Sequence, residues 1–172
     1  MHLGWLTADT VNRLVDGAVV TIGLTIATSV LAIIVGVGAG TLRLSVRRGR
    51  RTAAGVLIET FRNIPALIQI TFWTFAFPNL FAIDTRRMIF FDNALVNGLS
   101  TDSGLSVSYY ALAAGFALTL NTGAHLAELF RAGVGTLPRE GLETARSLGA
   151  GPRQVFWRIM LPGGLRASWT NR

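Results

Sequence analysis

The chain contains no cysteine and no lysine, and it has only two histidines among its 172 residues. The absence of cysteine excludes disulfides, thiolate metal sites and a cysteine nucleophile. The two histidines, His2 and His125, are too few for a histidine-rich metal site, and they argue against a catalytic triad. We therefore expect no metal site and no catalytic residues in this chain.

Charged residues are also scarce, at 15% of the chain, whereas 51% of the residues are hydrophobic and the mean hydropathy is +0.47. This is too little charge to cover a globule of this size, so the composition favours a membrane protein. All 16 basic residues are arginines, which give a net charge of +7. The arginines flank apolar runs and lie in no known nucleic-acid-binding module, so we expect no nucleic acid partner.

The longest uncharged run, residues 17–42, predicts the first membrane span. Its 26 residues, at about 1.5 Å each, can cross a hydrocarbon core of roughly 30 Å with some tilt. Small residues recur along it at steps of three or four and predict a face that packs on protein rather than lipid: Thr21, Thr25, Ser29, Ala32, Gly36 and Gly40. Small residues are also common in membrane helices in general, and that alternative stays open.

Two further spans are predicted at about 54–80 and 107–130. Pro65 divides the first of these, so we expect residues 54–63 to form interfacial or cytoplasmic helix before an apolar helix over about 65–77. Glu59 and Arg62 are three residues apart on that leading helix and are expected to pair. We expect an external loop over 81–106 and an interfacial lead-in over 1–16.

The arginines set the orientation of these spans. Of the 16 arginines, 13 lie in residues 43–62 and 131–172, which the positive-inside rule places in the cytoplasm. The amino terminus is then outside. The predicted fold is an all-α, multi-span transmembrane helical bundle that forms a single domain over 1–172.

Three polar residues in the last span lie on one helical face: Asn121, His125 and Glu128 are at i, i+4 and i+7. Ionisable groups at membrane depth usually face a bundle interior or a wet pathway, so this face is a candidate lining of a translocation path. The alternative is that Glu128 and Arg131 lie at the cytoplasmic boundary while Asn121 and His125 bond to neighbouring helices. A third hypothesis, an intramembrane enzyme that uses His125 and Glu128, has no accompanying nucleophile or metal set.

The segment 136–165 predicts a structured cytoplasmic loop of two short helices. Pro138 suits the first turn of a helix, and Gly149 suits the left-handed residue just past its end. A second helix starts at Pro152 and is expected to end before Pro162, because proline inside a helix removes a hydrogen bond. Glu143 on the first helix offers a carboxylate to an arginine of a partner.

Three strings of this sequence resemble one family. The spacing E-T-A-x3-G-x9-I-x-L-P over Glu143–Pro162 resembles the "EAA" signature of ABC importer permeases. The strings over Glu59–Gln69 and Leu120–Arg131 are similar to segments of the polar amino acid members, the histidine, glutamine and glutamate permeases. The chain is thus identified as a type I ABC importer permease subunit, and relatives continue past the signature with two more spans, so it resembles a permease truncated at its carboxyl end.

The resemblance implies a role without chemistry of its own. The residues that would couple to the ATPase are Glu143, Ala145, Gly149, Ile159, Leu161 and Pro162, and Gln69 joins Asn121, His125 and Glu128 as candidates for the translocation path. The implied partners are an ABC ATPase subunit that binds the ATP, a second permease subunit that is identical or homologous, a periplasmic or extracellular solute-binding protein, and membrane lipid. The implied location is the bacterial inner membrane. The alternative is a small membrane adaptor, or a non-functional permease fragment, that binds a cytoplasmic partner.

Overall fold

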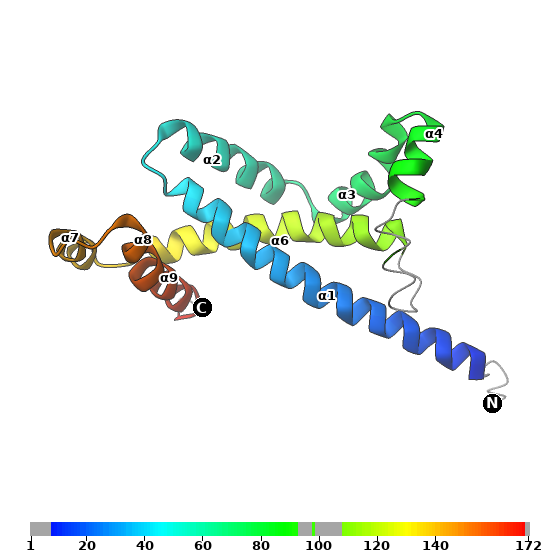
Figure 1. Ribbon diagram of the computed structural model, residues 1–172, viewed down its shortest axis with the longest axis horizontal. Coiled ribbons are helices and arrows are strands. Elements are labelled where there is room, and N and C mark those ends of the chain that lie inside the picture. The colour runs from blue at the N-terminus through cyan, green and yellow to red at the C-terminus, as the bar shows by residue number, and fades with distance from the viewer. Residues whose placement is uncertain (1–7, 93–97, 99–107, 171–172) are drawn as a thin grey trace. The chain divides into compact units, whose positions relative to one another are not determined.

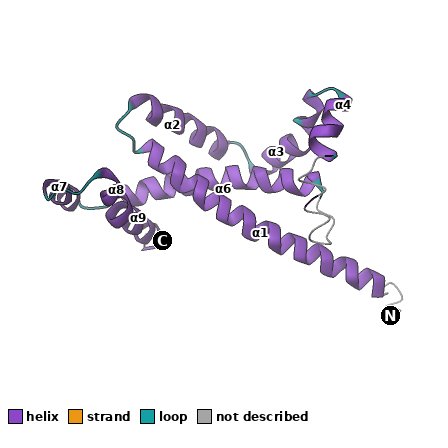
Figure 2. Ribbon diagram, in the orientation of Figure 1, coloured by secondary structure: helices purple, strands orange, loops and turns teal. Residues whose placement is uncertain are grey.

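The computed structural model describes residues 8–92, 98 and 108–170, and all regular structure in this part of the chain is helical (Figures 1 and 2). The chain divides into two compact units. Unit 1 comprises Met1–Leu31 and Ile64–Asn121, and unit 2 comprises Ala32–Asn63 and Thr122–Arg172. The all-α prediction is confirmed for the described residues.

Helix α1, Ala8–Arg43, runs from the predicted lead-in through the whole uncharged stretch. Asp9 lies in its first turn and pairs with Arg13 at 3.4 Å, which extends the helix into the charged lead-in. Within the described residues, only the segment Asp9–Arg43 is long and apolar enough to cross a membrane by length and composition. The other two predicted spans stay predictions.

Helix α1 packs on α6, Tyr109–Gly135, through its small residues. In unit 1, Leu24 and Thr28 contact Gly115, and in unit 2 Gly36 and Gly40 contact α6 so closely that a Cβ on Gly36 would lie 2.7 Å from the Cβ of Leu126. The predicted close approach at Gly36 and Gly40 is confirmed. Thr21, Thr25 and Ser29 are exposed on this chain, so they take no part in the contact with α6, and their packing on another protein stays a prediction. The residues of α1 that contact α6 are spaced four apart, at positions 24, 28, 32, 36 and 40, and form one ridge of the helix surface.

The region 54–80 is not one helix. Helix α2, Arg48–Asn63, ends before Pro65, which caps α3, Ala66–Thr71, from an extended conformation. A π-helical turn, η1, Phe72–Ala76, and a 3₁₀ turn, η2, Pro78–Leu80, follow. The helical run over 66–76 agrees with the apolar helix predicted for about 65–77.

The expected external loop begins with helix. Helix α4, Ile83–Arg86, and the π-helical turn η3, Arg87–Phe91, form within the segment that the polar composition predicted to be an external loop. Aromatic contacts account for this, because the rings of Phe90 and Tyr109 are 5.3 Å apart and the hydroxyl of Tyr109 donates to the carbonyl of Trp73 at 2.6 Å. Most of the remaining loop, Asp102 included, lies outside the described residues.

The carboxyl-terminal segment of unit 2 consists of α7, Arg139–Ser147, α8, Pro152–Val155, the π-helical turn η4, Phe156–Met160, and α9, Leu161–Thr170. The start at Pro152 is confirmed. The prediction that this helical run ends before Pro162 was wrong, because Pro162 is the second residue of α9 and follows directly on the wider η4 turn.

Alanines supply much of the buried apolar surface, which permits close helix packing: Ala32, Ala54, Ala113, Ala117, Ala124 and Ala127.

Candidate coupling surface and polar helix face

Helix α7 ends in a left-handed turn at Gly149, whose φ is +83°. The N–H of Gly149 donates to the carbonyl of Arg146 at 3.0 Å, and the N–H of Ala150 donates to that of Ala145 at 3.0 Å. This pair of bonds is the Schellman motif, which satisfies the last carbonyls of a helix and favours glycine at its left-handed residue. The turn predicted at Gly149 is therefore present. Nearby, the side chain of Gln154 accepts the N–H of Gly151 at 3.0 Å and so caps the start of α8.

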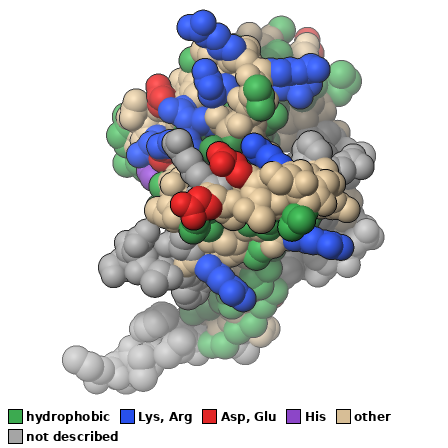
Figure 3. Space-filling model, turned by 90° about the vertical axis from the view of Figure 1, so that its left-hand side faces the viewer, with side chains coloured by type: hydrophobic (Ala, Val, Ile, Leu, Met, Phe, Trp, Pro, Cys, Tyr) green, Lys and Arg blue, Asp and Glu red, His purple; other side chains and the backbone are tan. Residues whose placement is uncertain are grey.

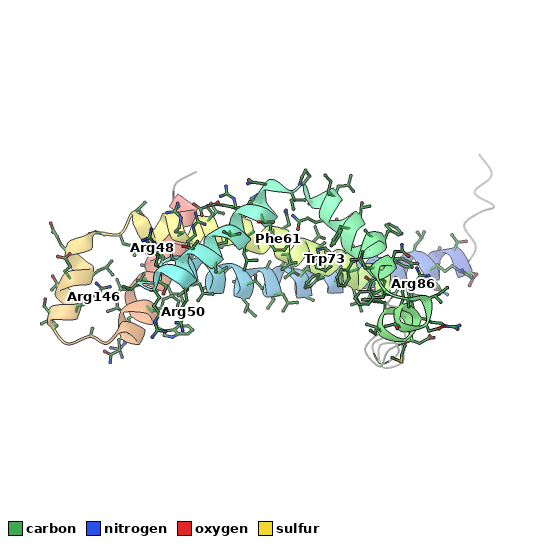
Figure 4. All side chains as sticks on the ribbon, turned by 90° about the horizontal axis from the view of Figure 1, so that it is seen from above. Arg48, Arg50, Phe61, Trp73, Arg86 and Arg146 are labelled. Atoms are coloured by element: carbon green, nitrogen blue, oxygen red, sulfur yellow. The ribbon has the colours of Figure 1, made fainter. Side chains whose placement is uncertain are left out.

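The six predicted coupling residues divide by exposure. Glu143, Gly149 and Pro162 are exposed, whereas Ala145, Ile159 and Leu161 are half-buried. Leu148, at the tip of the turn, is 83% exposed. Arg146 projects from α7 in Figure 4. The end of α7 thus presents a carboxylate, a guanidinium and a large apolar side chain together.

The loop is seated on the carboxyl-terminal part of α6 through glycine contacts. A Cβ on Gly133 would collide with the carbonyl oxygen of Gly164, and one on Gly164 would lie 2.8 Å from Cγ2 of Val134. The rings of Phe130 and Phe156 add an edge contact with centroids 6.5 Å apart. Because backbone meets backbone at Gly133 and Gly164, α9 has little freedom to shift against α6 without breaking this contact.

In unit 1 the structure brings two candidate path residues, Gln69 and Asn121, together at one backbone carbonyl. The side-chain amide of Gln69 donates to the carbonyl of Ile64 at 2.9 Å, and that of Asn121 donates to the same oxygen at 3.4 Å. Ile64 directly precedes the break at Pro65, where the helical hydrogen-bond ladder is interrupted. Both amides therefore satisfy the carbonyl that directly precedes Pro65, which supports the packing alternative for Asn121.

In unit 2 the candidate Glu128 belongs to an ion network centred on Arg43. Arg131 donates to Oε1 of Glu128 at 2.5 and 2.9 Å, and Nε of Arg43 lies 3.9 Å from Oε2 of Glu128. Arg43 also donates to Glu59 at 2.7 Å. The predicted pair of Glu59 with Arg62 was wrong: the end of α1 passes α2 and supplies the nearer guanidinium, so Glu59 bonds across helices instead of along its own.

Arg43 and Gly55 are the members of this network that sequence reasoning missed. A Cβ on Gly55 would lie 2.6 Å from Nη1 of Arg43, so the glycine leaves the space that the guanidinium occupies. A signal existed, because Gly36, Gly40 and Arg43 follow each other at steps of four and three. This periodicity places Arg43 on the face of α1 that meets α6.

His125 is an exposed residue of unit 2 in this structure. Within the described residues no three histidine, aspartate or glutamate side chains gather as a metal site would require. Glu128, the proposed partner of His125 in an intramembrane enzyme, is already engaged by two arginines. The geometry therefore gives that hypothesis no support.

Arginine dominates the charge of unit 2. Figure 3 faces the side of this unit that carries α7, and it shows mainly blue charged side chains with fewer red ones. Arg48 and Arg50 project from the first turns of α2 in Figure 4. A concentration of cations beside an apolar helix is the pattern that the cytoplasmic side of membrane proteins carries.

Comparison with known families matches residues 29–170 to the family described as binding-protein-dependent transport system inner membrane component. The glutamate transport system permease protein GluD of Corynebacterium glutamicum is 31% identical over 138 residues, which are 80% of this chain and 43% of that protein. The probable glutamine ABC transporter permease protein GlnP of Bacillus subtilis is 31% identical over 151 residues, which are 88% of this chain and 58% of that protein. The chain thus spans about half the length of these relatives.

Two solved structures share the fold. A crystal structure of an amino acid ABC transporter with histidines has a TM-score of 0.52 and 20% identity, with 95% of this chain and 68% of that chain covered. An inward-facing structure of the MetNI methionine ABC transporter has a TM-score of 0.62 and 19% identity, with 96% of this chain and 68% of that chain covered. At this level of identity the likeness is one of architecture.

Proposed function

The chain belongs to the family of binding-protein-dependent transport system inner membrane components, and from this premise we propose that it serves as a permease subunit of an ATP-driven importer for polar amino acids. Family membership agrees with the prediction that the chain is not an enzyme. The amino acid class is supported by the names of the relatives, which include glutamate and glutamine permeases. The three motif strings of the sequence point to the same class.

The observation that carries this proposal is the exposed end of α7. Glu143 is exposed, Leu148 is 83% exposed, and the Schellman turn at Gly149 fixes the direction in which they are presented. A short helix with an apolar tip and a charged flank fits a groove on a partner protein. The proposed partner is an ABC ATPase subunit, which would bind the ATP and move this helix.

Coupling also requires that motion at α7 reach the membrane. The glycine contact between Gly133 and Gly164 joins α9 to α6, and the ion network of Arg43 joins α6 to α1 and α2 within unit 2. Packed elements of this kind move as rigid bodies, which is how transporters alternate access. A second permease subunit and a solute-binding protein on the outer side complete the proposed assembly.

The proposed topology is multi-pass with the amino terminus outside. It rests on the 13 arginines within 43–62 and 131–172 and on the apolar helix over Asp9–Arg43. In this orientation α7 and the first turn of α2 lie in the cytoplasm. We propose His125, which is exposed in this structure, as a candidate contact for solute.

The test is co-purification with the cognate ATPase subunit after Glu143→Ala, with Glu140→Ala as the matched control. Both carboxylates are exposed on α7 and both changes remove one negative charge. We expect Glu143→Ala to lower recovery of the ATPase about tenfold, the effect of losing one charge-assisted hydrogen bond, and Glu140→Ala to leave it near wild type. Equal recovery from both variants would contradict the docking role and favour the adaptor alternative, in which the arginine-rich surface alone attracts a partner.

A further inference from the structure

The first turn of α2 concentrates positive charge at the amino-terminal end of the helix, where cations are unfavourable. Arg48, Arg50 and Arg51 lie within the first four residues of α2, Arg47 precedes them, and this turn holds no acidic residue. The amino-terminal end of a helix already carries a partial positive charge from its unpaired N–H groups, so arginines there are unfavourable. A bound anion at this turn would offset both effects.

A cleft lies against this turn within unit 2. Its volume is about 400 Å³, and it is lined by Arg43, Arg51 and Arg131 from three helices, together with Leu44, Thr52, Gly55, Val56 and Glu59. Since one water occupies about 30 Å³ of liquid, the cleft has room for a group much larger than water. Its three guanidinium groups face one lining carboxylate, that of Glu59.

The donors in the cleft are unequally engaged. Arg43 donates to Glu59, and Arg131 donates to Glu128, which does not line the cleft. Arg51 forms no ion pair among the described residues, and it is an exposed member of the cleft lining. Arg51 is therefore the guanidinium that can turn to an anion without first leaving a carboxylate.

The position of the cleft, at the end of the apolar helix α1, indicates which anion it meets. Arg43 ends the apolar helix α1, and two apolar side chains, Leu44 and Val56, line the cleft and form its apolar rim, with Val56 59% exposed. Apolar side chains beside arginine fit the boundary between acyl chains and headgroups, where lipid phosphates lie. A soluble anion would gain nothing from this apolar rim.

We propose that the cleft of Arg43, Arg51 and Arg131 binds the phosphate of an anionic phospholipid headgroup, with the apolar rim of Leu44 and Val56 against its acyl chains. The bound phosphate accepts from Arg51 and neutralises the amino-terminal end of α2. It thereby fixes α2 against the Arg43 network. This inference goes beyond solute transport and needs only that α1 crosses the bilayer.

The experiment measures binding of short-chain phosphatidylglycerol, short-chain phosphatidylcholine and inorganic phosphate to the full chain in a neutral detergent. The variant is Arg51→Gln, and the matched control is Arg50→Gln. The control removes the same charge from the neighbouring residue, whose side chain does not line the cleft. We expect wild type to prefer phosphatidylglycerol, and Arg51→Gln to weaken that binding about tenfold, as for one charge-assisted hydrogen bond. Arg50→Gln should change it less than twofold.

Each alternative has its own result. Equal loss in both variants would mean diffuse attraction to the arginines and would overturn the site. Inorganic phosphate bound as tightly as the lipid, with the same dependence on Arg51, would assign the site to a free anion. Unchanged lipid binding in Arg51→Gln together with loss of the ATPase would assign Arg51 to an acidic protein surface instead. An unchanged thermal unfolding midpoint of Arg51→Gln without lipid verifies that the variant is folded.

Discussion

Replacing Gly133 by alanine should unseat the carboxyl-terminal loop from α6. The ideal Cβ at Gly133 falls on the carbonyl group of Gly164, 3.2 Å from its carbon and closer still to its oxygen. A backbone carbonyl cannot rotate away as a side chain would, so α9 must move. Gly135 is the matched control, because it lies on the same helix two residues later and a Cβ there would meet nothing within 4 Å.

The size of the effect follows from the contact. Forcing one methyl group into a packed contact costs about 1–3 kcal/mol. If that cost falls on the equilibrium between seated and unseated loop, the unseated population rises by a factor of about 5 to 140. Gly135→Ala adds no clash, so it should leave this equilibrium unchanged.

The assay is limited trypsin digestion of inside-out membrane vesicles, since the segment 139–166 contains five arginines. We expect the cleavage rate in that segment to rise at least fivefold in Gly133→Ala and to stay at the wild-type rate in Gly135→Ala. If the proposed function holds, solute uptake should fall in parallel, because an unseated α9 would no longer transmit motion from α7 to α6. Equal cleavage rates for both variants would show that the contact between Gly133 and Gly164 does not hold the loop. The proposed coupling from α7 through α9 to α6 would then be contradicted.

Two further outcomes are expected. Arg43→Gln should lower the stability of the detergent-solubilised protein by about 1–3 kcal/mol, because the carboxylate of Glu128, which is 22% exposed, loses a cation. Glu59→Gln should cost at most about 1 kcal/mol, because the side chain of Glu59 is 58% exposed. Equal shifts of the two unfolding midpoints would refute the central position of Arg43. Ala150→Cys places a single thiol beside the Schellman turn of a chain without cysteine, and it should resist a membrane-impermeant maleimide until cells are permeabilised. Labelling of intact cells would invert the proposed topology.

Local chemistry predicted the loop around α7 well, because its signals act over a few residues. Pro138, Gly149 and Pro152 each fix a backbone conformation, and the structure has a helix boundary or a left-handed residue at each of them. The Gly36 and Gly40 contact was also predictable, since only small side chains permit such an approach. Features that depend on the properties of a single residue, such as a proline or a glycine, were therefore predictable from the sequence.

Choices between partners were not predictable in the same way. Glu59 has Arg62 three residues away on its own helix, yet it bonds to Arg43, which is 16 residues earlier. That outcome depends on where α1 passes α2, which no local rule contains. The same holds for Asn121 and Gln69, whose shared acceptor at Ile64 exists only because Pro65 opens the backbone there. The contacts of these polar groups depend on residues from other helices. The sequence could therefore identify the groups as candidates, but it could not assign their partners.

The helical run through Pro162 shows how a single-residue rule can be physically right and still predict the wrong boundary. Two segments share the pattern F-W-x4-P, Phe72–Pro78 in unit 1 and Phe156–Pro162 in unit 2, and each contains a five-residue π-helical turn. In both, the residue before the proline donates its N–H to a carbonyl five residues back, from Phe77 to Phe72 and from Leu161 to Phe156. Proline collides with the carbonyl four residues earlier in a regular helix, and the wider turn moves that carbonyl aside. Helix α9 therefore continues from η4 without interruption, which places Gly164 where it can meet Gly133. The proline widens the helix at this point and does not end it, and the contact that seats the loop depends on that widening.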